Sequence, residues 1–165
     1  MSFLDKEPVK RVKNFLSKFN SDLNIIALDT SAKTAMEAAS SLSCDVGAIV
    51  KSLILRTEKK FILCLVAGDK RVSLSKIKKI LNIKDASMAS AEEVKSVTGF
   101  TIGGVAPTGH LNKLDVFIDN SLERFENLYA AAGHPNCVFK ISFKDLLKIT
   151  NGSIKEIIEW NNLNY

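Results

Sequence analysis

Two apolar runs joined by a short polar turn constrain the fold of this chain more than any other feature. The runs are Ile49–Arg56 and Phe61–Ala67, and the turn TEKK lies between them. Strand-like runs separated by a short polar connection predict a β-hairpin. A sheet that contains this hairpin should therefore form the centre of the fold.

Further segments with strand or helix patterns surround the hairpin. Short strands are predicted at 24–29, 116–119, 128–131 and 138–141. Helices are predicted where apolar residues recur at helical spacing or a capping residue precedes them, at 8–19, 34–42, 74–81, 90–98 and 142–150. Because hairpins and helices are interspersed, we expect an α/β (α+β) fold with a mixed, mainly antiparallel sheet flanked by helices. The length suits a single compact domain, 1–165.

Positive charge is concentrated in one stretch of the chain. The net charge is +5, and residues 51–84 hold ten Lys or Arg residues against two acids. The rest of the chain holds 13 basic and 16 acidic residues. A basic surface attracts polyanions such as nucleic acid, but a solvated lysine-rich surface has the same composition. Charge alone leaves both interpretations open.

The cysteines and histidines do not form a metal-binding pattern. Cys44, Cys64 and Cys137 lie far apart without a CxxC pair, and His110 and His134 complete no zinc spacing. We therefore expect neither a metal nor another cofactor. No apolar run approaches the ~18 residues of a membrane helix, and the N-terminal stretch is too charged for a signal peptide. These features predict a cytoplasmic protein with no membrane partner.

The segment GFTIGGVAPTGH (99–110) is the least ordinary part of the sequence. It holds four glycines and one proline in twelve residues, which predicts a loop. Within it, Gly103–Pro107 has the pattern GxxxP. Glycines permit close backbone approach to a ligand, and exposed N–H groups can hold a phosphate or a developing oxyanion. A wide structural turn is the alternative, and the patterns GxGxxG and GK[ST] are absent.

Lys51 is an unusual residue within its strand. Because side chains alternate along a strand, Lys51 shares a face with Ile49, Leu53 and Leu55. A lysine on an apolar face either extends toward solvent or points into a cleft, where its charge can orient a phosphate or a carbonyl. The local sequence does not decide between these interpretations.

The two histidines are candidates for proton transfer or hydrogen bonding. His110 closes the glycine-rich loop, and His134 follows a strand of small residues and begins a turn. Each could equally be an ordinary polar turn residue. The nucleophile pattern GxSxG and the zinc pattern HExxH are absent, and no cysteine stands out as a nucleophile. This inventory fits hydrolysis by backbone electrostatics and substrate assistance better than a covalent intermediate.

Four segments together resemble the YbaK-like aminoacyl-tRNA deacylases, which include free-standing homologues of the editing domain in bacterial prolyl-tRNA synthetase. They are IVKSL (49–53), TGFTIGGVAPTGH (98–110), DVFID (115–119) and AAAGHPN (130–136). Each segment is weak alone, but their order and spacing together are specific. The resemblance runs from about Val9 to Ile154 and implies a compact α/β domain around a mixed sheet.

The resemblance also implies a site. The family's essential strand lysine corresponds to Lys51, and its GxxxP loop corresponds to Gly103, Gly104, Val105, Ala106 and Pro107. The loop N–H groups should stabilise the oxyanion of ester hydrolysis, while Lys51 holds the terminal phosphate or the aminoacyl end. Residues expected to bind substrate around this catalytic set are Ser52, Gly109, His110, Gly133 and His134. Some family members have Asn or Thr where this chain has Ser52.

The activity implied by the resemblance is trans-editing, which is hydrolysis of the ester of a tRNA that carries a wrong, small amino acid. Alanine or serine/threonine is favoured, on tRNA for proline. The acceptor end of the charged tRNA is the expected partner, with an aminoacyl-tRNA synthetase as a second candidate. The alternatives are a deacylase for cysteinyl-tRNA(Pro) and a module that binds tRNA or synthetase without hydrolysis. A general nucleic-acid-binding protein should interleave aromatics with its basic residues, and 51–84 holds only Phe61.

Overall fold

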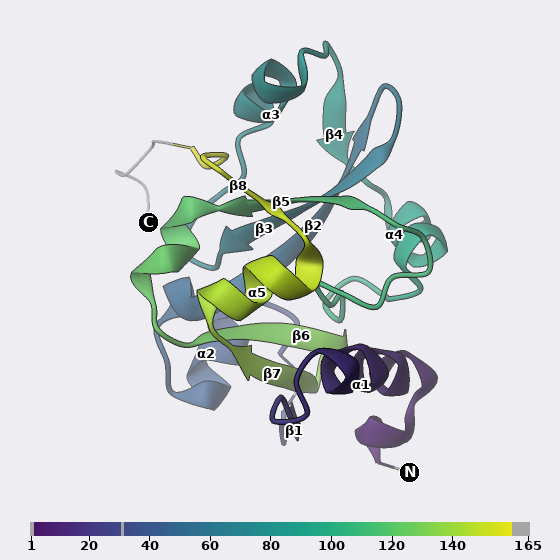
Figure 1. Ribbon diagram of the computed structural model, residues 1–165, viewed down its shortest axis with the longest axis vertical. Coiled ribbons are helices and arrows are strands. Elements are labelled where there is room, and N and C mark those ends of the chain that lie inside the picture. The colour runs from purple at the N-terminus through teal and green to yellow at the C-terminus, as the bar shows by residue number, and fades with distance from the viewer. Residues whose placement is uncertain (1, 31, 160–165) are drawn as a thin grey trace.

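A mixed sheet of eight strands lies at the centre of the computed structural model, which describes residues 2–30 and 32–159 (Figure 1). Seven strands lie in the order β1-β7-β6-β2-β3-β5-β8, and β4 pairs with β2. The strands are β1 (Ile25–Ala27), β2 (Ile49–Thr57), β3 (Phe61–Ala67), β4 (Ala86–Met88), β5 (Asp115–Asp119), β6 (Leu128–His134), β7 (Cys137–Ile141) and β8 (Ser153–Lys155).

The strand pairings confirm the predicted mixed, mainly antiparallel sheet. β2 and β3 form the predicted hairpin, in which Lys51 lies opposite Val66. The pairs β1–β7, β2–β4 and β6–β7 are also antiparallel, whereas β2–β6, β3–β5 and β5–β8 are parallel. The sequence pattern missed β4 and β8 because strands of three residues are too short to show a period.

All five predicted helices are present, as α1 (Glu7–Phe19), α2 (Ala35–Leu42), α3 (Leu74–Leu81), α4 (Ala91–Thr98) and α5 (Phe143–Thr150). Ser90 and Glu93 form a complete capping box at the start of α4. Thr34 caps α2 by accepting a hydrogen bond from the Glu37 N–H at 3.1 Å. Gly99 ends α4 in the left-handed conformation, with φ of 80°. Three short 3-10 helices, Phe3–Asp5, Val46–Ala48 and Asn120–Arg124, were not predicted.

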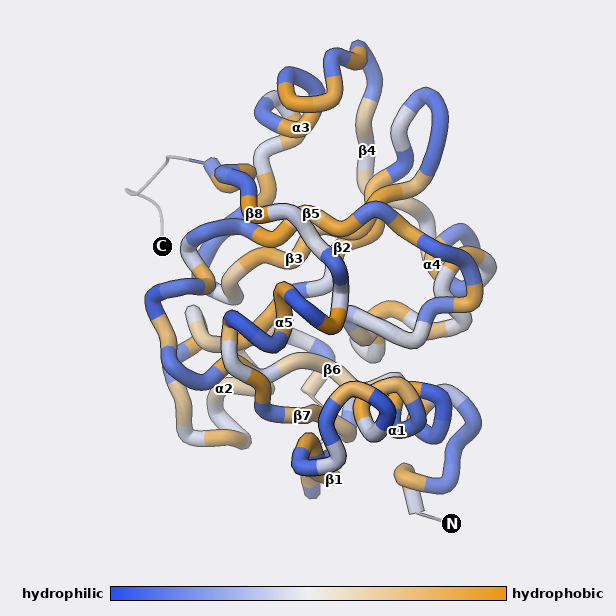
Figure 2. The backbone as a smooth tube through the Cα atoms, viewed as in Figure 1, coloured by the Kyte–Doolittle hydropathy of each residue, from blue (hydrophilic) through white to orange (hydrophobic). Residues whose placement is uncertain are grey.

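The sheet separates a large hydrophobic core from two smaller ones. Side chains of α1, α4 and α5 pack with one face of β2 and β3 in the large core. The opposite face packs on α3 around Ile77, and α2 covers Ile49 at the end of β2. Figure 2 shows that the central strands are mostly hydrophobic and that many of the peripheral turns are hydrophilic. Within 2–30 and 32–159, no helix has the length and apolar character that crossing a bilayer requires.

One edge of β2 pairs with two strands, β6 and β4, each over only a few residues. The stretch of β2 between these two pairings is where the candidate site lies. β6 pairs only with Ile49 and Val50, where β2 begins. β4 pairs with Leu55 to Thr57, near the other end. On this edge, none of the described strands pairs with Lys51, Ser52 or Leu53. The sheet therefore has a gap beside the lysine that the sequence singled out.

Candidate active site

A cavity of about 330 Å³ opens at this gap in the sheet. Its walls come from β2, from β6, from α2 with the residues before it, and from the loop that follows α4. The polar lining residues are Lys33, Thr34, Lys51 and Ser52. The other lining residues are Ala32, Ala35, Ala38, Ile49, Val50, Leu53, Ile102, Gly103, Val105, Tyr129, Ala130, Ala131 and Val138. The cavity thus combines two lysines, Lys33 and Lys51, with a mostly small and aliphatic wall.

Alanines create the space at this position. Ala130 and Ala131 face the cavity from β6, and the pairing of β6 with β7 becomes irregular between Ala131 and His134. Ala35 and Ala38 contribute one face of α2. Because a methyl group fills far less volume than the larger side chains typical of a core, these positions leave a hollow between well-packed elements.

Lys51 is half-buried at the cavity wall, and its ammonium donates a hydrogen bond to the Lys70 carbonyl. Burial lowers the pKa of Lys51, the nearby Asp69 carboxylate partly opposes this, and Arg71 lowers it further. An ammonium has three N–H donors, so the contact with Lys70 leaves two for a ligand. Lys51 therefore places an ammonium beside an apolar hollow. This arrangement fits the interpretation that Lys51 points into a cleft and not the interpretation that it extends toward solvent.

Asp69 is fixed next to this cation by an ion pair. The Arg124 guanidinium contacts both oxygens of Asp69, at 2.7 and 3.0 Å. The hydrogen bond from Arg124 is the main cause that holds the pKa of Asp69 below its ordinary value. Because Asp69 is already paired, it balances part of the charge of Lys51 without occupying its ammonium.

The glycine-rich loop is seated directly on the backbone of β6. A methyl group added at Gly104 would lie 2.9 Å from the Cα of His134, so only glycine permits this approach. Gly103 has φ of +93°, which also favours glycine. The close approach that the structure shows is to the backbone of β6, and the predicted approach to a ligand stays a prediction.

Several N–H groups of the loop have no hydrogen-bond acceptor within residues 2–30 and 32–159. The Gly104 N–H donates to the Thr101 carbonyl at 3.0 Å. Among the described residues, no acceptor receives a hydrogen bond from the N–H of Gly103, Val105 or Ala106. Val105 and Ala106 are buried, and buried N–H groups are almost always paired in native proteins. A loop with this pattern has donors available for a ligand.

Ser52 adds a second unsatisfied group at the same place. Its hydroxyl oxygen is buried and has no hydrogen-bond partner among the described residues. The residue lines the cavity next to Lys51. A buried hydroxyl without a partner costs free energy, so a polar atom of a bound ligand would stabilise it.

Other predicted residues lie elsewhere. Pro107, Gly109 and His110 line a separate, larger cleft of about 540 Å³, together with residues of α1, β5 and α5. The lining of neither cavity includes Gly104, Ala106, Gly133 or His134. The structure thus brings Lys51, Ser52, Gly103 and Val105 together and places the remaining members of the predicted set around or behind the loop.

His134 is the last residue of β6 and directly precedes the two turn residues, Pro135 and Asn136, that lead into β7. Its ring packs on Phe3, with ring centres 4.5 Å apart. Its Nδ1 accepts a hydrogen bond from the Asn136 N–H at 3.0 Å. Burial and the charge of Lys6 lower its pKa. The neighbouring Gly133, with φ of +96°, lies against the backbone of Pro8, so both residues contact the N-terminal segment.

His110 supports the loop from the side away from the lysine. Its Nε2 lies 2.7 Å from the Ala106 carbonyl, and since a carbonyl only accepts, Nε2 carries the proton. Burial is the main effect and lowers the pKa of His110. An imidazole bonded in this way holds the loop, and it does not line the 330 Å³ cavity, so it is not placed to remove a proton from a ligand there.

Part of the predicted basic surface is neutralised by ion pairs. Arg56 lies 3.6 Å from Glu93, Lys60 pairs with Asp115, and Lys76 lies 3.1 Å from Glu156. Within the part of the chain that the structure describes, no group of three or more His, Cys, Asp or Glu residues is arranged to hold a metal ion.

Sequence reasoning missed the cavity wall contributed by α2 and β6. The signal was present, because alanines recur at 32, 35 and 38 and again at 130–132. Such runs also occur in ordinary helices and strands. Only the three-dimensional arrangement shows that the first set, together with Ala130 and Ala131, lines the same hollow.

Comparisons with known proteins identify relatives that match most of the chain. Residues 29–149 match the profile of the aminoacyl-tRNA editing domain. The protein YwhH of Bacillus subtilis (strain 168) is 32% identical over 139 residues, which cover 84% of this chain and 88% of YwhH. A solved structure described as a candidate trans-editing enzyme for prolyl tRNA synthetase has 35% identity and a TM-score of 0.88, and the match covers 93% of this chain and 98% of that one.

Longer proteins contain a matching segment. The proline–tRNA ligase of Caldicellulosiruptor bescii is 34% identical over 131 residues. That match covers 74% of this chain but only 23% of the ligase. The similarity to the ligases is therefore to one segment of a much longer chain.

Proposed function

Because this chain belongs to the aminoacyl-tRNA editing domain family, we propose that it is a trans-editing deacylase that hydrolyses the ester of a mischarged tRNA. The preferred substrate carries a small amino acid, alanine or serine/threonine, on tRNA for proline. One observation carries the proposal. A single cavity is lined by a half-buried lysine and by a loop whose N–H groups at Gly103, Val105 and Ala106 lack acceptors within the described residues.

The loop supplies the electrostatic part of the mechanism. Attack on an ester carbonyl places negative charge on its oxygen, and preorganised N–H donors stabilise this oxyanion. Removing one such donor costs roughly 3 kcal/mol in other hydrolases. The N–H groups of Gly103 and Val105 are suited to this role because both residues line the cavity and neither N–H has an acceptor among the described residues.

Lys51 orients the substrate and does not attack it. Its ammonium contacts the Lys70 carbonyl and retains two donors for the terminal phosphate or for the aminoacyl end. Proton transfer then falls to the 2′-hydroxyl of the terminal adenosine or to a water that this hydroxyl orients. No protein nucleophile is required, which agrees with the absence of a cysteine, histidine or carboxylate from the lining of the 330 Å³ cavity.

The size of the hollow supports a small amino acid. The wall of the cavity is formed largely by alanine and by aliphatic side chains. The buried, unpartnered hydroxyl of Ser52 supports a polar contact with the substrate, either with its amino group or with a side-chain hydroxyl. Cysteinyl-tRNA(Pro) remains the alternative substrate, since one methyl, thiol or hydroxyl changes binding by only about 1–3 kcal/mol.

A panel of tRNAs charged with alanine, serine, threonine, cysteine or proline tests the proposal. We expect wild type to release at least one of the four wrong amino acids faster than the uncatalysed rate, and Lys51→Ala to lose most of that activity. Absence of hydrolysis on every tRNA would refute the proposed function. Tight binding of tRNA without hydrolysis would instead favour a non-catalytic binding module, and steep salt dependence without preference for charged tRNA would favour general nucleic-acid binding.

A further inference from the structure

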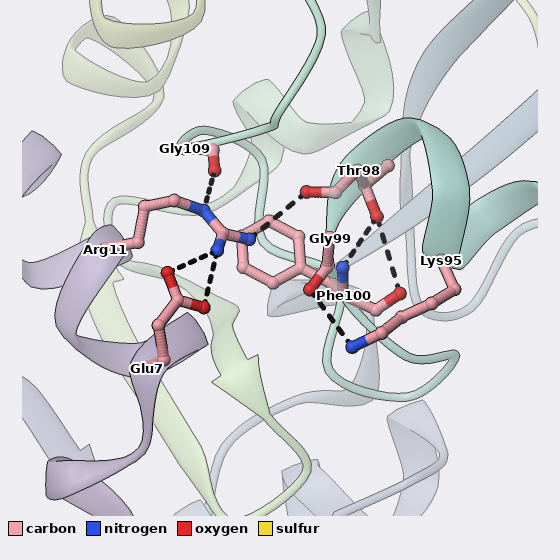
Figure 3. A network of polar contacts seen from close by, with 7 residues as sticks. All are labelled: Glu7, Arg11, Lys95, Thr98, Gly99, Phe100 and Gly109. Atoms are coloured by element: carbon pink, nitrogen blue, oxygen red, sulfur yellow. Dashed lines mark hydrogen bonds and ion pairs between the residues drawn. The ribbon is translucent and has the colours of Figure 1, made fainter.

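Arg11 of α1 is tied to the two ends of the glycine-rich loop. Its Nε donates to the Gly109 carbonyl at 2.7 Å, and its Nη2 donates to the Thr98 carbonyl at 3.2 Å (Figure 3). Thr98 is the last residue of α4, so these two carbonyls bracket the loop. A side chain distant in sequence therefore joins the place where the loop leaves α4 to the place where it ends.

The same guanidinium also packs on the first side chain of the loop. Its central carbon lies 4.6 Å from the centre of the Phe100 ring, and Phe100 is fully buried. The Arg11 side chain is only 16% exposed. Charge-assisted hydrogen bonds and cation–π contacts are stronger when water is largely excluded, as it is here.

The contacts on the solvent side of Arg11 are of a different kind. Nη1 lies 2.8 Å from both oxygens of Glu7, but the Glu7 side chain is 73% exposed. Exposed ion pairs within a helix contribute little, so the contact with Glu7 adds little to the hold of Arg11 on the loop. Arg11 thus makes one exposed contact, with Glu7, and two partly buried contacts, with the Thr98 and Gly109 carbonyls, that hold the loop.

We propose that Arg11 is a positioning residue for the deacylation reaction. Between the two anchored carbonyls lie Gly103 and Val105, whose N–H groups have no acceptor among the residues that the structure describes and are the proposed oxyanion donors. Arg11 touches neither the 330 Å³ cavity nor these N–H groups, so it acts through the path of the loop. This inference rests on the proposed function only where it concerns the reaction rate. Its structural part, the ordering of the loop, is independent of any activity.

The geometry requires arginine at this position. A guanidinium is planar, carries five N–H donors in fixed directions and stacks on an aromatic ring. Lysine keeps the charge, but its single ammonium cannot bridge both carbonyls while covering the Phe100 ring. We therefore expect Arg11→Lys to retain only part of the effect.

Hydrogen exchange tests the structural part. In Arg11→Met, the hydrogen-bonded amides of Phe100 and Gly104 should exchange at least tenfold faster than in wild type, while those of β3 and β5 stay unchanged. Glu7→Gln is the matched control, because it removes the exposed ion pair and keeps both carbonyl contacts, and it should leave the loop protected. If Arg11→Met does not fold, Arg11→Lys takes its place in the same comparison. Unchanged exchange in the loop would overturn the inference.

Single-turnover and steady-state deacylation test the catalytic part. Misplacing catalytic groups by about 1 Å can cost about 100-fold in rate, so Arg11→Met should lower kcat by 10- to 100-fold with little change in KM. Ile77→Val is the control for lost stability, because Ile77 is fully buried in the separate α3 core, and its kcat should match wild type. An unchanged kcat in Arg11→Met, or an equal loss in Ile77→Val, would overturn the inference. If wild type hydrolyses no tRNA, the proposed function fails, while hydrogen exchange still decides whether Arg11 orders the loop.

Discussion

Replacing Gly104 with alanine tests whether the path of the loop controls the reaction. The added methyl group would lie 2.9 Å from the His134 Cα, 3.0 Å from the His134 nitrogen and 3.1 Å from the Gly133 carbonyl carbon. All three are backbone atoms of β6, which cannot turn aside as a flexible side chain can. Ordinary contact begins near ~3.5 Å, so the loop must move by about 0.5 Å.

A displacement of this size is enough to affect catalysis. Productive sites are held to within roughly 0.5 Å, and an error of about 1 Å can cost 100-fold. We therefore expect Gly104→Ala to lower kcat by about 10- to 100-fold, which corresponds to roughly 1.4–2.7 kcal/mol of transition-state stabilisation. The φ of Gly104 is not in the positive range that favours glycine. The expected loss of kcat therefore comes from the steric contact and not from backbone strain.

The assay is single-turnover deacylation of the tRNA that wild type prefers, together with thermal unfolding. Val105→Ala is the matched control. It removes two methyl groups from the same loop but adds no steric contact, so the backbone of the loop can keep its conformation. It should lower kcat less than Gly104→Ala does. A Gly104→Ala enzyme within twofold of wild type, or a Val105→Ala enzyme impaired as strongly, would show that the loop does not act through its backbone position.

Two further predictions concern Lys51 and Ser52. Burial lowers the pKa of Lys51 in the folded protein below its ordinary value of about 10.4 in the unfolded chain. Between the folded and the unfolded pKa, the unfolded chain binds more protons than the folded protein does. The free energy of unfolding therefore rises with pH in this range. Urea denaturation from pH 7 to pH 11 should show wild type gaining stability relative to Lys51→Met, and a constant difference would contradict the buried-cation description. Ser52→Ala should reduce kcat/KM about tenfold on serine-charged tRNA and less on alanine-charged tRNA, because a substrate hydroxyl would lose its partner. Equal values for wild type and variant on both tRNAs would exclude Ser52 from substrate recognition.

The sequence predicted the main elements because they carry strong local signals. Each signal determines the structure of its own short segment. Examples are the apolar runs Ile49–Arg56 and Phe61–Ala67, which form strands, and Ser90 and Gly99, which begin and end α4. Each element is therefore visible in a short window of the chain. The strands β4 and β8 depend on pairing with distant partners, so three residues of local sequence could not reveal them.

The candidate site was predictable only in part, for the same reason. Lys51 and the Gly103–Pro107 loop stand out by composition, and the structure places Lys51 with Gly103 and Val105 around one cavity. His110 and His134 also stood out, but their surroundings are set by Ala106 and Phe3, which no local pattern links to them. Arg11 was not noticed, because an arginine in an amphipathic helix looks like an ordinary surface residue until its contacts with Thr98 and Gly109 are seen.

The rate of amino-acid release from mischarged and correctly charged tRNA for proline tests the central claim most directly. Wild-type protein is mixed with alanyl-tRNA(Pro), seryl-tRNA(Pro) and prolyl-tRNA(Pro) in parallel, and each rate is compared with the uncatalysed rate. The account predicts fast release of alanine or serine, background release of proline, and loss of the fast release in Lys51→Ala. Background rates on both mischarged tRNAs, or equal release of proline, would contradict it.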